Sequence, residues 1–494
     1  MSANPGAAGG PPLIFERSRP GRRTATLPPA EVPPVEPADS IPDELLRRRP
    51  PALPETDELT LVRHYTRLSQ QNFGIDTHFY PLGSCSMKYN PRLNETLAAH
   101  PALAQAHPYQ ADDEVQGTLQ LLYEVGESIK EITGFPEICL QPAAGAHGEA
   151  TALMVIRARL ADRGDAGKRN VILFPDSAHG TNPASVSRCG FTPRQLASCE
   201  RGLLDLGAVE EAVAQGGVAA LMVTIPNTLG LFETDIRRIA DVLHDAGAYL
   251  YVDGANLNAI LGVCRPHDFG ADVMHINTHK TFSTPHGGGG PGAGPIAVSD
   301  ELAPYLPAPL VVRDGDRYAL DHDRPKSIGR VRSFFGQTGV YLRAWAYLRA
   351  LGPDGVRRTG EMAVLNANYL RARLRGLLEI PHDRICGHEF VASAARLKKE
   401  HGVRALDVAK RLLDLGFHPS TIYFPLIVPE CLMIEPTETE SKETLDAFAE
   451  AIGTIVSEAQ RDPEALRRAP RRMPVGRLDE VAAVKEPHLR WIME

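Results

Sequence analysis

The sequence predicts an α/β fold, with a large α/β domain over residues 59–349 and a smaller α+β domain over residues 350–494. Three observations support this prediction. Short apolar runs alternate with amphipathic stretches in the large domain, as in a parallel sheet buried on both faces. The 494 residues are 43% apolar, which is ample material for such a core. The alternation ends near residue 349, where longer helical patterns replace it.

Residues 1–58 are predicted to form a proline-rich N-terminal arm that is partly disordered. The first 54 residues contain 13 prolines and little apolar periodicity. A segment of this composition cannot bury enough apolar surface to offset the entropy that it loses on folding. We therefore assign it no part of the core.

The large domain is predicted to alternate helices with buried strands. Residues 118–132 and 235–245 carry apolar side chains on one helical face. Short and nearly continuous apolar runs predict strands at 170–174, 219–225, 248–252, 273–276 and 295–298.

The smaller domain is predicted from two helical and two strand patterns. Residues 362–378 and 441–456 indicate helices, and the second has Leu445 and Phe448 on its apolar face. Strand patterns occur at 390–392 and 431–435.

The composition excludes several classes of protein. The net charge of −8 argues against a nucleic-acid partner, because nucleic-acid-binding domains usually carry a basic patch. No apolar run approaches the roughly 18 residues of a membrane span. The seven cysteines include no CxxC pair, so we expect neither a disulfide framework nor a metal site, and we expect a reducing cytoplasm.

Lys280 is the first candidate catalytic residue. It lies in the segment 277–282 (Asn-Thr-His-Lys-Thr-Phe), directly after the predicted strand at 273–276. Ligands of open α/β sheets bind at the carboxyl ends of the strands, and a lysine there can form an imine with a carbonyl. The alternative is a solvated surface lysine. The glycine run at 287–290 does not have the spacing of a P-loop.

Asp253 directly follows the predicted strand at 248–252. A carboxylate in this position can keep the nitrogen of a bound pyridine ring protonated. The alternative is that Asp253 caps the helix that follows.

Two weaker signals lie upstream. His179 follows the strand at 170–174 and can stack on an aromatic cofactor, although a lone loop histidine is more often structural. Small residues at 141–149 open a predicted helix, and bare amides at a helix N-terminus bind phosphate. Small residues also begin helices for packing reasons. In chain order, the four signals match pyridoxal-phosphate enzymes of the aspartate-aminotransferase fold.

Several segments together resemble the glycine cleavage system P-protein family, also called glycine dehydrogenase (decarboxylating), and specifically the β chain (subunit 2) of its two-chain form. The resemblance covers roughly residues 60 to 460. The matching segments are 76–88 (DTHFYPLGSCSMK), 275–282 (HINTHKTF), 332–336 (RSFFG), 425–430 (PLIVPE) and 434–440 (IEPTETE).

The resemblance implies a fold-type-I enzyme that depends on pyridoxal 5'-phosphate. It implies decarboxylation of glycine, release of CO2 and transfer of the aminomethyl group to the lipoyl arm of H-protein. It also implies a separate α chain (subunit 1) and an α2β2 assembly, with neither nucleic acid nor membrane as a partner. Two alternatives remain open: another amino-acid decarboxylase or aminotransferase of this fold, and a scaffold subunit without activity.

The resemblance also implies a role for each residue that contacts the ring. Lys280 would hold the cofactor covalently, and Asp253 would keep its ring nitrogen protonated. His179 would stack on one face of the ring, while Ala255 would pack on the other.

At the phosphate, the resemblance implies contacts from Asn277 and His279. The amides of Gly145 and Ala146 are further candidates. His279 has proton transfer as an alternative role, and the sequence does not separate the two.

Other positions have less certain roles. Thr224 and Thr228 are candidates to bond the ring hydroxyl. His147 and Asn227 depart from the residues that relatives usually carry, so we assign them no role. For Cys85, an inert buried thiol is favoured over a redox role.

Overall fold

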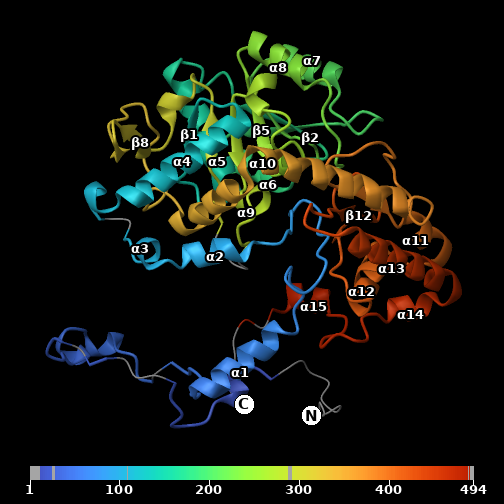
Figure 1. Ribbon diagram of the computed structural model, residues 1–494, viewed down its shortest axis with the longest axis horizontal. Helices are drawn as coiled ribbons and strands as arrows, with labels where there is room; N and C mark the ends of the chain where they lie inside the picture. The colour runs from blue at the N-terminus through green and yellow to red at the C-terminus, as the bar shows by residue number, and fades with distance from the viewer. Residues whose placement is uncertain are drawn as a thin grey trace. The chain divides into compact units, whose positions relative to one another are not determined.

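The computed structural model describes residues 12–24, 28–29, 31–49, 51–107, 110–286, 292–487 and 489. Two compact units make up the chain, Ile75–Arg467 and a second unit of Met1–Gly74 with Arg468–Glu494 (Figure 1). The glycine run at 287–290 lies outside the described residues. Among the described helices, none is both long enough and apolar enough to cross a membrane.

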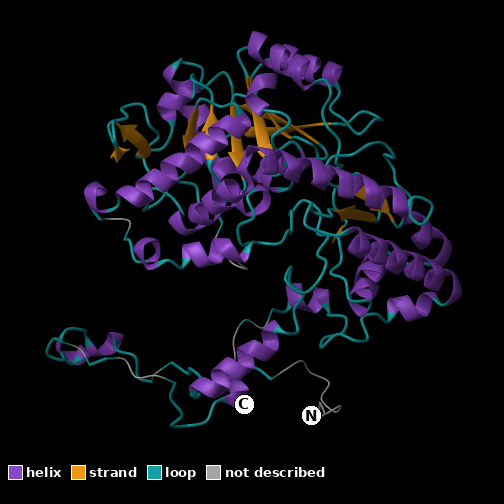
Figure 2. Cartoon of the chain, in the orientation of Figure 1, coloured by secondary structure: helices purple, strands orange, loops and turns teal. Residues whose placement is uncertain are grey.

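A seven-stranded sheet forms the centre of the unit Ile75–Arg467. Its strand order is β1-β7-β6-β5-β4-β2-β3, in which β3, β2, β4, β5 and β6 are parallel and β7 and β1 are antiparallel to their neighbours. The strands are β1 Glu137–Cys139, β2 Val171–Pro175, β3 Thr192–Leu196, β4 Val218–Thr224, β5 Tyr249–Gly254, β6 Val273–Ile276 and β7 Ile296–Val298. Figure 2 shows the sheet flanked by helices.

Both faces of this sheet are buried, as the apolar runs predict. All seven residues of β4 are buried. Leu221 and Val223 belong to one apolar cluster, whereas Ala220 and Met222 belong to another. Because successive side chains of a strand point to opposite faces, β4 must be covered on both sides.

The five predicted strands are confirmed, with ends that shift by at most two residues. Two strands of the seven-stranded sheet were not predicted, nor were β8 Leu310–Asp314, β9 Arg317–Asp321 and β11 Thr421–Ile422 outside it. The sequence of β3 is polar, because this strand forms the edge of the sheet and most of its residues are not buried. The short strand β1 is the other edge, and three residues are too few to show a pattern.

Helices connect and cover the strands. The helix predicted at 362–378 is the second half of the long helix α10, which Gly352 interrupts with φ 63° and ψ −179°. The proposed domain boundary after residue 349 falls within α10, close to this kink. The helices of this unit are α2 Arg92–Ala98, α3 Pro101–Ala104, α4 Gln116–Thr133, α5 Gly145–Asp162, α6 Thr181–Arg188, α7 Leu206–Ala214, α8 Ile236–Asp245, α9 Thr278–Thr281, α10 Thr338–Leu374, α11 Ala395–His401, α12 Ala405–Asp414, α13 Lys442–Arg461 and α14 Pro463–Arg467, with short 3-10 helices at Asp112–Glu114, Leu257–Ala259, Pro266–Phe269 and Ala303–Tyr305.

A three-stranded antiparallel sheet lies within residues 350–467, in the order β10-β12-β11. Its strands are β10 Phe390–Ser393, β11 Thr421–Ile422 and β12 Cys431–Ile434. An apolar cluster that includes Phe448 and Ile452 of α13 joins this sheet to its helices. A separate hairpin consists of β8 Leu310–Asp314 and β9 Arg317–Asp321.

The second unit contains α1 Glu58–Ser69 and α15 Glu480–Lys485. The carboxylate of Asp57 caps α1 by accepting a hydrogen bond of 2.8 Å from the Thr60 amide. Short 3-10 helices occur at Ile14–Arg17, Pro37–Asp39 and Asp43–Leu45.

Candidate functional site

A cavity of about 290 Å³ lies at the carboxyl ends of β4, β5 and β6. It contains every site residue that the sequence analysis names, although these residues come from five separate segments. They are Gly145, Ala146, His179, Thr224, Thr228, Asp253, Ala255, Asn277, His279 and Lys280. Five further residues line it: Ser84, Ala144, Glu149, Thr181 and His275.

Strand register explains why three of these residues are neighbours. Thr224 of β4 pairs with Asp253 of β5, and Asp253 pairs with His275 of β6. Because the strands are parallel, their carboxyl ends meet at one edge of the sheet. Residues that are separated along the chain therefore form one row beside the cavity.

The carboxylate of Asp253 is buried and held by three groups. His275 Nε2 lies 3.2 Å from its Oδ1, and the Ala255 amide donates to the same oxygen at 2.9 Å. The side-chain amide of Asn182 donates to Oδ2 at 3.1 Å. Burial alone would raise the pKa of Asp253. The charge and hydrogen bond of His275 outweigh burial, together with the Ala255 amide and the charge of Lys280, so the pKa of Asp253 is lowered.

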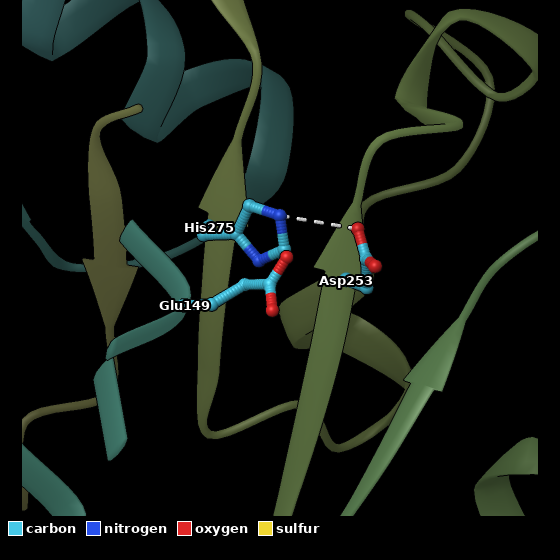
Figure 3. Close-up of side chains that lie close together, drawn as sticks. All are labelled: Glu149, Asp253 and His275. Atoms are coloured by element: carbon cyan, nitrogen blue, oxygen red, sulfur yellow. Dashed lines mark ion pairs between the residues drawn. The ribbon is translucent and has the colours of Figure 1, made fainter. Parts of the chain in front are cut away.

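His275 is the ionic partner of Asp253, and the sequence analysis gave it no role. Burial lowers the pKa of His275, but the attraction of Asp253 outweighs burial and raises it above the ordinary histidine value. Tyr251 and His275 are hydrogen-bonded through the hydroxyl and Nδ1, at 2.9 Å. Figure 3 shows His275 pointing at Asp253, with Glu149 of α5 beside them. Glu149 accepts hydrogen bonds of 2.8 Å from Thr181 and Ser185.

Lys280 lies on the one-turn helix α9, which begins immediately after the buried end of β6. Its side chain is half-buried and lines the cavity. The strand end and the short helix together direct Lys280 toward the edge that Asp253 occupies.

The N-terminus of α5 forms another wall of the cavity. No side chain caps this helix, and the first amide bonded within it is that of Gly148. A Cβ atom at Gly145 would lie 2.6 Å from Oδ1 of Asn277, so a larger residue there would displace the Asn277 side chain. The helix therefore presents bare amides to the cavity, an arrangement that binds anions.

Three histidines at or next to the cavity, His279, His286 and His179, are electrically neutral at neutral pH, whereas Asp253 favours the charged form of His275. Burial, followed by the charges of His286 and Lys280, lowers the pKa of His279 to about 3. Burial and Lys280 lower the pKa of His286 to about 4, and the same two causes lower that of His179. Neutral imidazoles can stack or accept hydrogen bonds, but they supply no positive charge.

Two family models match the chain. One, described as glycine cleavage system P-protein, matches residues 37–319, and the other, described as glycine dehydrogenase, C-terminal domain, matches residues 359–470. The chain belongs to the glycine cleavage system P-protein family.

Relatives in this family match nearly the whole chain. A probable glycine dehydrogenase (decarboxylating) subunit 2 of Halalkalibacterium halodurans is 56% identical, over 97% of this chain and 98% of its own length. A protein of the same name from Pyrococcus abyssi is 55% identical, over 98% and 96%.

Solved structures with the same fold include other proteins as well. A glycine decarboxylase (P-protein) in inhibitor-bound form matches with a TM-score of 0.72 and 24% identity, over 84% of this chain and 94% of that one. A cysteine desulfurase from Thermococcus onnurineus matches with a TM-score of 0.61 and 17% identity, over 77% and 95%. At these identities the likeness concerns the fold, and it confirms the predicted fold-type-I class.

His147 and Asn227, to which the sequence assigned no role, hold the backbone beside the cavity. His147 Nδ1 accepts a hydrogen bond of 3.1 Å from the Ala143 amide. Asn227 accepts from the amides of Leu229 and Leu231, so it shapes the loop that follows β4. The adjacent Thr228 lines the cavity and donates its hydroxyl to the Ser177 carbonyl at 2.5 Å.

The first P-protein segment, 76–88, reaches the cavity through Ser84. The sequence analysis used this segment only for the resemblance, because no local pattern indicates that it folds back onto the strand ends. Cys85 is half-buried, and burial raises the pKa of its thiol to about 11.

Proposed function

We propose that this chain is the cofactor-binding β subunit of a pyridoxal-phosphate-dependent glycine decarboxylase. It would decarboxylate glycine, release CO2 and pass the aminomethyl group to the lipoyl arm of H-protein. The observation that carries this proposal is the cavity itself, which brings Lys280, Asp253, His179 and the α5 N-terminus together at the strand ends.

Several features of the cavity suit pyridoxal phosphate. Three buried polar atoms beside it have no hydrogen-bond partner among the described residues: Thr224 Oγ1, Asn277 Oδ1 and His279 Nδ1. The bare amides of α5 suit the phosphate, and the ionised Asp253 suits a protonated ring nitrogen. Lys280 supplies the amine.

Bound here, pyridoxal phosphate would supply an electron sink for the electron pair that remains when the glycine carboxyl group leaves as CO2. Asp253 would hold a proton on the ring nitrogen, and His275 would keep Asp253 ionised. Lys280 Nζ would hold the cofactor until the glycine amine replaces it. His179 would pack on the ring as a neutral imidazole.

We infer that a second chain completes the enzyme. The relatives are named subunit 2, and the names imply a partner subunit. We propose an α2β2 assembly in which the α chain completes the glycine-binding site and lipoylated H-protein docks as the acceptor. The reaction requires the lipoyl disulfide to reach the carbanion before a water proton does, so the assembled site must limit water.

The test is the exchange of the glycine carboxyl group with labelled bicarbonate. The chain would be assayed with pyridoxal phosphate and lipoylated H-protein, with and without the α chain, and beside the variant Lys280→Ala. Exchange that requires both chains and Lys280 would support the proposal. Bound cofactor without exchange under any condition would contradict it and would favour another amino acid as the substrate.

A further inference from the structure

A strained turn, Ser84–Ser86, forms part of the cavity wall. Ser84 and Ser86 have φ values of 66° and 46°, in the left-handed region that residues other than glycine rarely adopt. Such a conformation is strained and persists only where the surroundings hold it. Since Ser84 lines the cavity, whatever holds the turn also shapes the site.

Two buried carboxylates hold the turn by its amides. Glu389 Oε2 accepts from the Ser84 amide at 2.6 Å. Glu435 Oε2 accepts from the amides of Cys85 at 3.1 Å and Ser86 at 2.8 Å, and its Oε1 accepts from the Ser86 hydroxyl. All three consecutive amides of the turn therefore donate to these two side chains.

The small sheet places the two carboxylates opposite each other. Phe390 of β10 pairs with Ile434 of β12 in antiparallel register, and Glu389 and Glu435 are the next residues outward. Their side chains are buried, at 0% and 1% exposure. A carboxylate oxygen of each lies within 4.8 Å of the other and of a ring nitrogen of His388.

No cation compensates two negative charges here. Among the described residues, neither carboxylate forms an ion pair with lysine or arginine, and His388 Nε2 is 3.5 Å from Glu435 Oε1. His388 is 1% exposed and makes no hydrogen bond in the described structure, and burial lowers its pKa, so it is neutral. Burial and the charge of Glu435 raise the pKa of Glu389 well above its ordinary value. The other titratable groups that face the pair are Cys85, Lys280 and the buried ion pair of Lys88 with Glu438.

We propose that this pair of buried carboxyl groups holds one proton, on Glu389, and that the pair is the positioning device that fixes Ser84 in the cavity wall. The proposal rests on the proposed function only in taking this cavity as the place where glycine reacts. The proton leaves one buried charge, which the Cys85 and Ser86 amides and the Ser86 hydroxyl stabilise. Glu389 holds the Ser84 amide and, through Oε1, the side-chain amide of Asn256.

The proposal predicts an order among four variants in the exchange assay. Glutamine is neutral, and its carbonyl oxygen can accept from the Ser84 amide as Glu389 Oε2 does, so Glu389→Gln should retain most of the kcat/KM that Glu389→Ala loses. Glu435→Gln should lower kcat/KM about tenfold or more, because both oxygens of Glu435 accept hydrogen bonds from the turn and the NH2 group of glutamine cannot accept them, so the turn shifts. Glu430→Gln is the matched control, since Glu430 accepts from the Ala405 amide and contacts Lys398 outside the cavity. The pH profile adds a second readout: alkaline pH should lower kcat/KM by ionising Glu389 in the wild type, but not in Glu389→Gln.

An infrared measurement tests the proton without any activity. The purified protein should show a carbonyl stretch of a buried carboxylic acid that Glu389→Gln loses and that both Glu233→Gln and Glu430→Gln keep. The proposal would be overturned if this band survives in Glu389→Gln, or if the Glu389→Gln enzyme is as impaired as Glu389→Ala. A stoichiometric metal ion in the purified protein would also overturn it. If the wild type lacks exchange but shows the band, the proposed function fails and this inference stands.

Discussion

Asp253 illustrates how the site depends on a neighbour that no sequence pattern indicates. A buried carboxylate remains ionised only when surrounding groups stabilise its charge. His275, the Ala255 amide and Lys280 do so, and their effect exceeds that of burial. The ionised Asp253 would therefore provide the fixed negative charge that a protonated ring nitrogen requires.

We predict that Asp253→Asn retains the cofactor but slows decarboxylation on the order of a hundredfold, because a neutral amide cannot hold the ring nitrogen protonated. The measurement is kcat for carboxyl exchange, alongside a titration with pyridoxal phosphate. Asp245→Asn, at the exposed end of α8, is the control. An unchanged kcat in Asp253→Asn would refute the role.

The second prediction for a single residue concerns Gly145. Alanine there would press its Cβ against the Asn277 side chain, at 2.6 Å, and would displace the α5 amides. We expect Gly145→Ala to weaken pyridoxal-phosphate binding about tenfold or more, measured by titration of the visible absorbance. Gly167→Ala should bind normally, because Gly167 has open space around it. Equal affinities of the two variants would contradict the phosphate site.

The raised pKa of Glu233 predicts that the stability of the fold depends on pH. Burial raises its pKa from 4.5 to about 7, so the folded chain binds this proton more tightly than the unfolded chain does. Its contribution to stability is therefore present below pH 4.5 and is lost as the pH rises through about 7. The melting temperature of the wild type should fall more over this range than that of Glu233→Gln, with the exposed Glu210→Gln as the control. Parallel curves for the wild type and Glu233→Gln would contradict the assignment.

At the scale of elements, the segment 76–88 joins the cofactor cavity to the small sheet. Lys88 is buried at its end, where Nζ bonds Glu438 at 2.8 Å and the Thr281 carbonyl at 2.8 Å. Thr281 directly follows Lys280, so this ion pair fastens α9, the helix that carries Lys280.

We expect Lys88→Met to lower the free energy of unfolding by about 3–5 kcal/mol, because Glu438 would remain buried and unpaired. Urea unfolding measures the change. Lys442→Met is the matched control, since Lys442 is 67% exposed beside Asp446 and should change stability little. A loss in Lys88→Met no larger than in Lys442→Met would show that the ion pair does not fasten the segment.

The local sequence pattern predicts the strands that are buried on both faces, but it does not predict the edge strands of the sheet. The five inner strands were predicted because their side chains are mostly apolar, whereas β3 is polar and was not predicted. For the site, short motifs beside strand ends indicate Lys280 and Asp253. Contacts between distant segments, such as His275 with Asp253 and Glu435 with Ser86, depend on strand register and on the path of the chain, which no short pattern records.

For the whole molecule, the central claim is that one cavity at the strand ends of this P-protein chain is the cofactor site. Every role proposed for Asp253, His179 and the α5 amides depends on it. The sequence contains ten lysines, so the claim concerns which of them binds the cofactor.

The most direct measurement is borohydride reduction of the chain loaded with pyridoxal phosphate, followed by mass spectrometry of its peptides. Reduction fixes the cofactor on the lysine that holds it. The account predicts one phosphopyridoxyl group, on Lys280, and none in Lys280→Ala. A group on another lysine in the wild type, with Lys280 unlabelled, would contradict it.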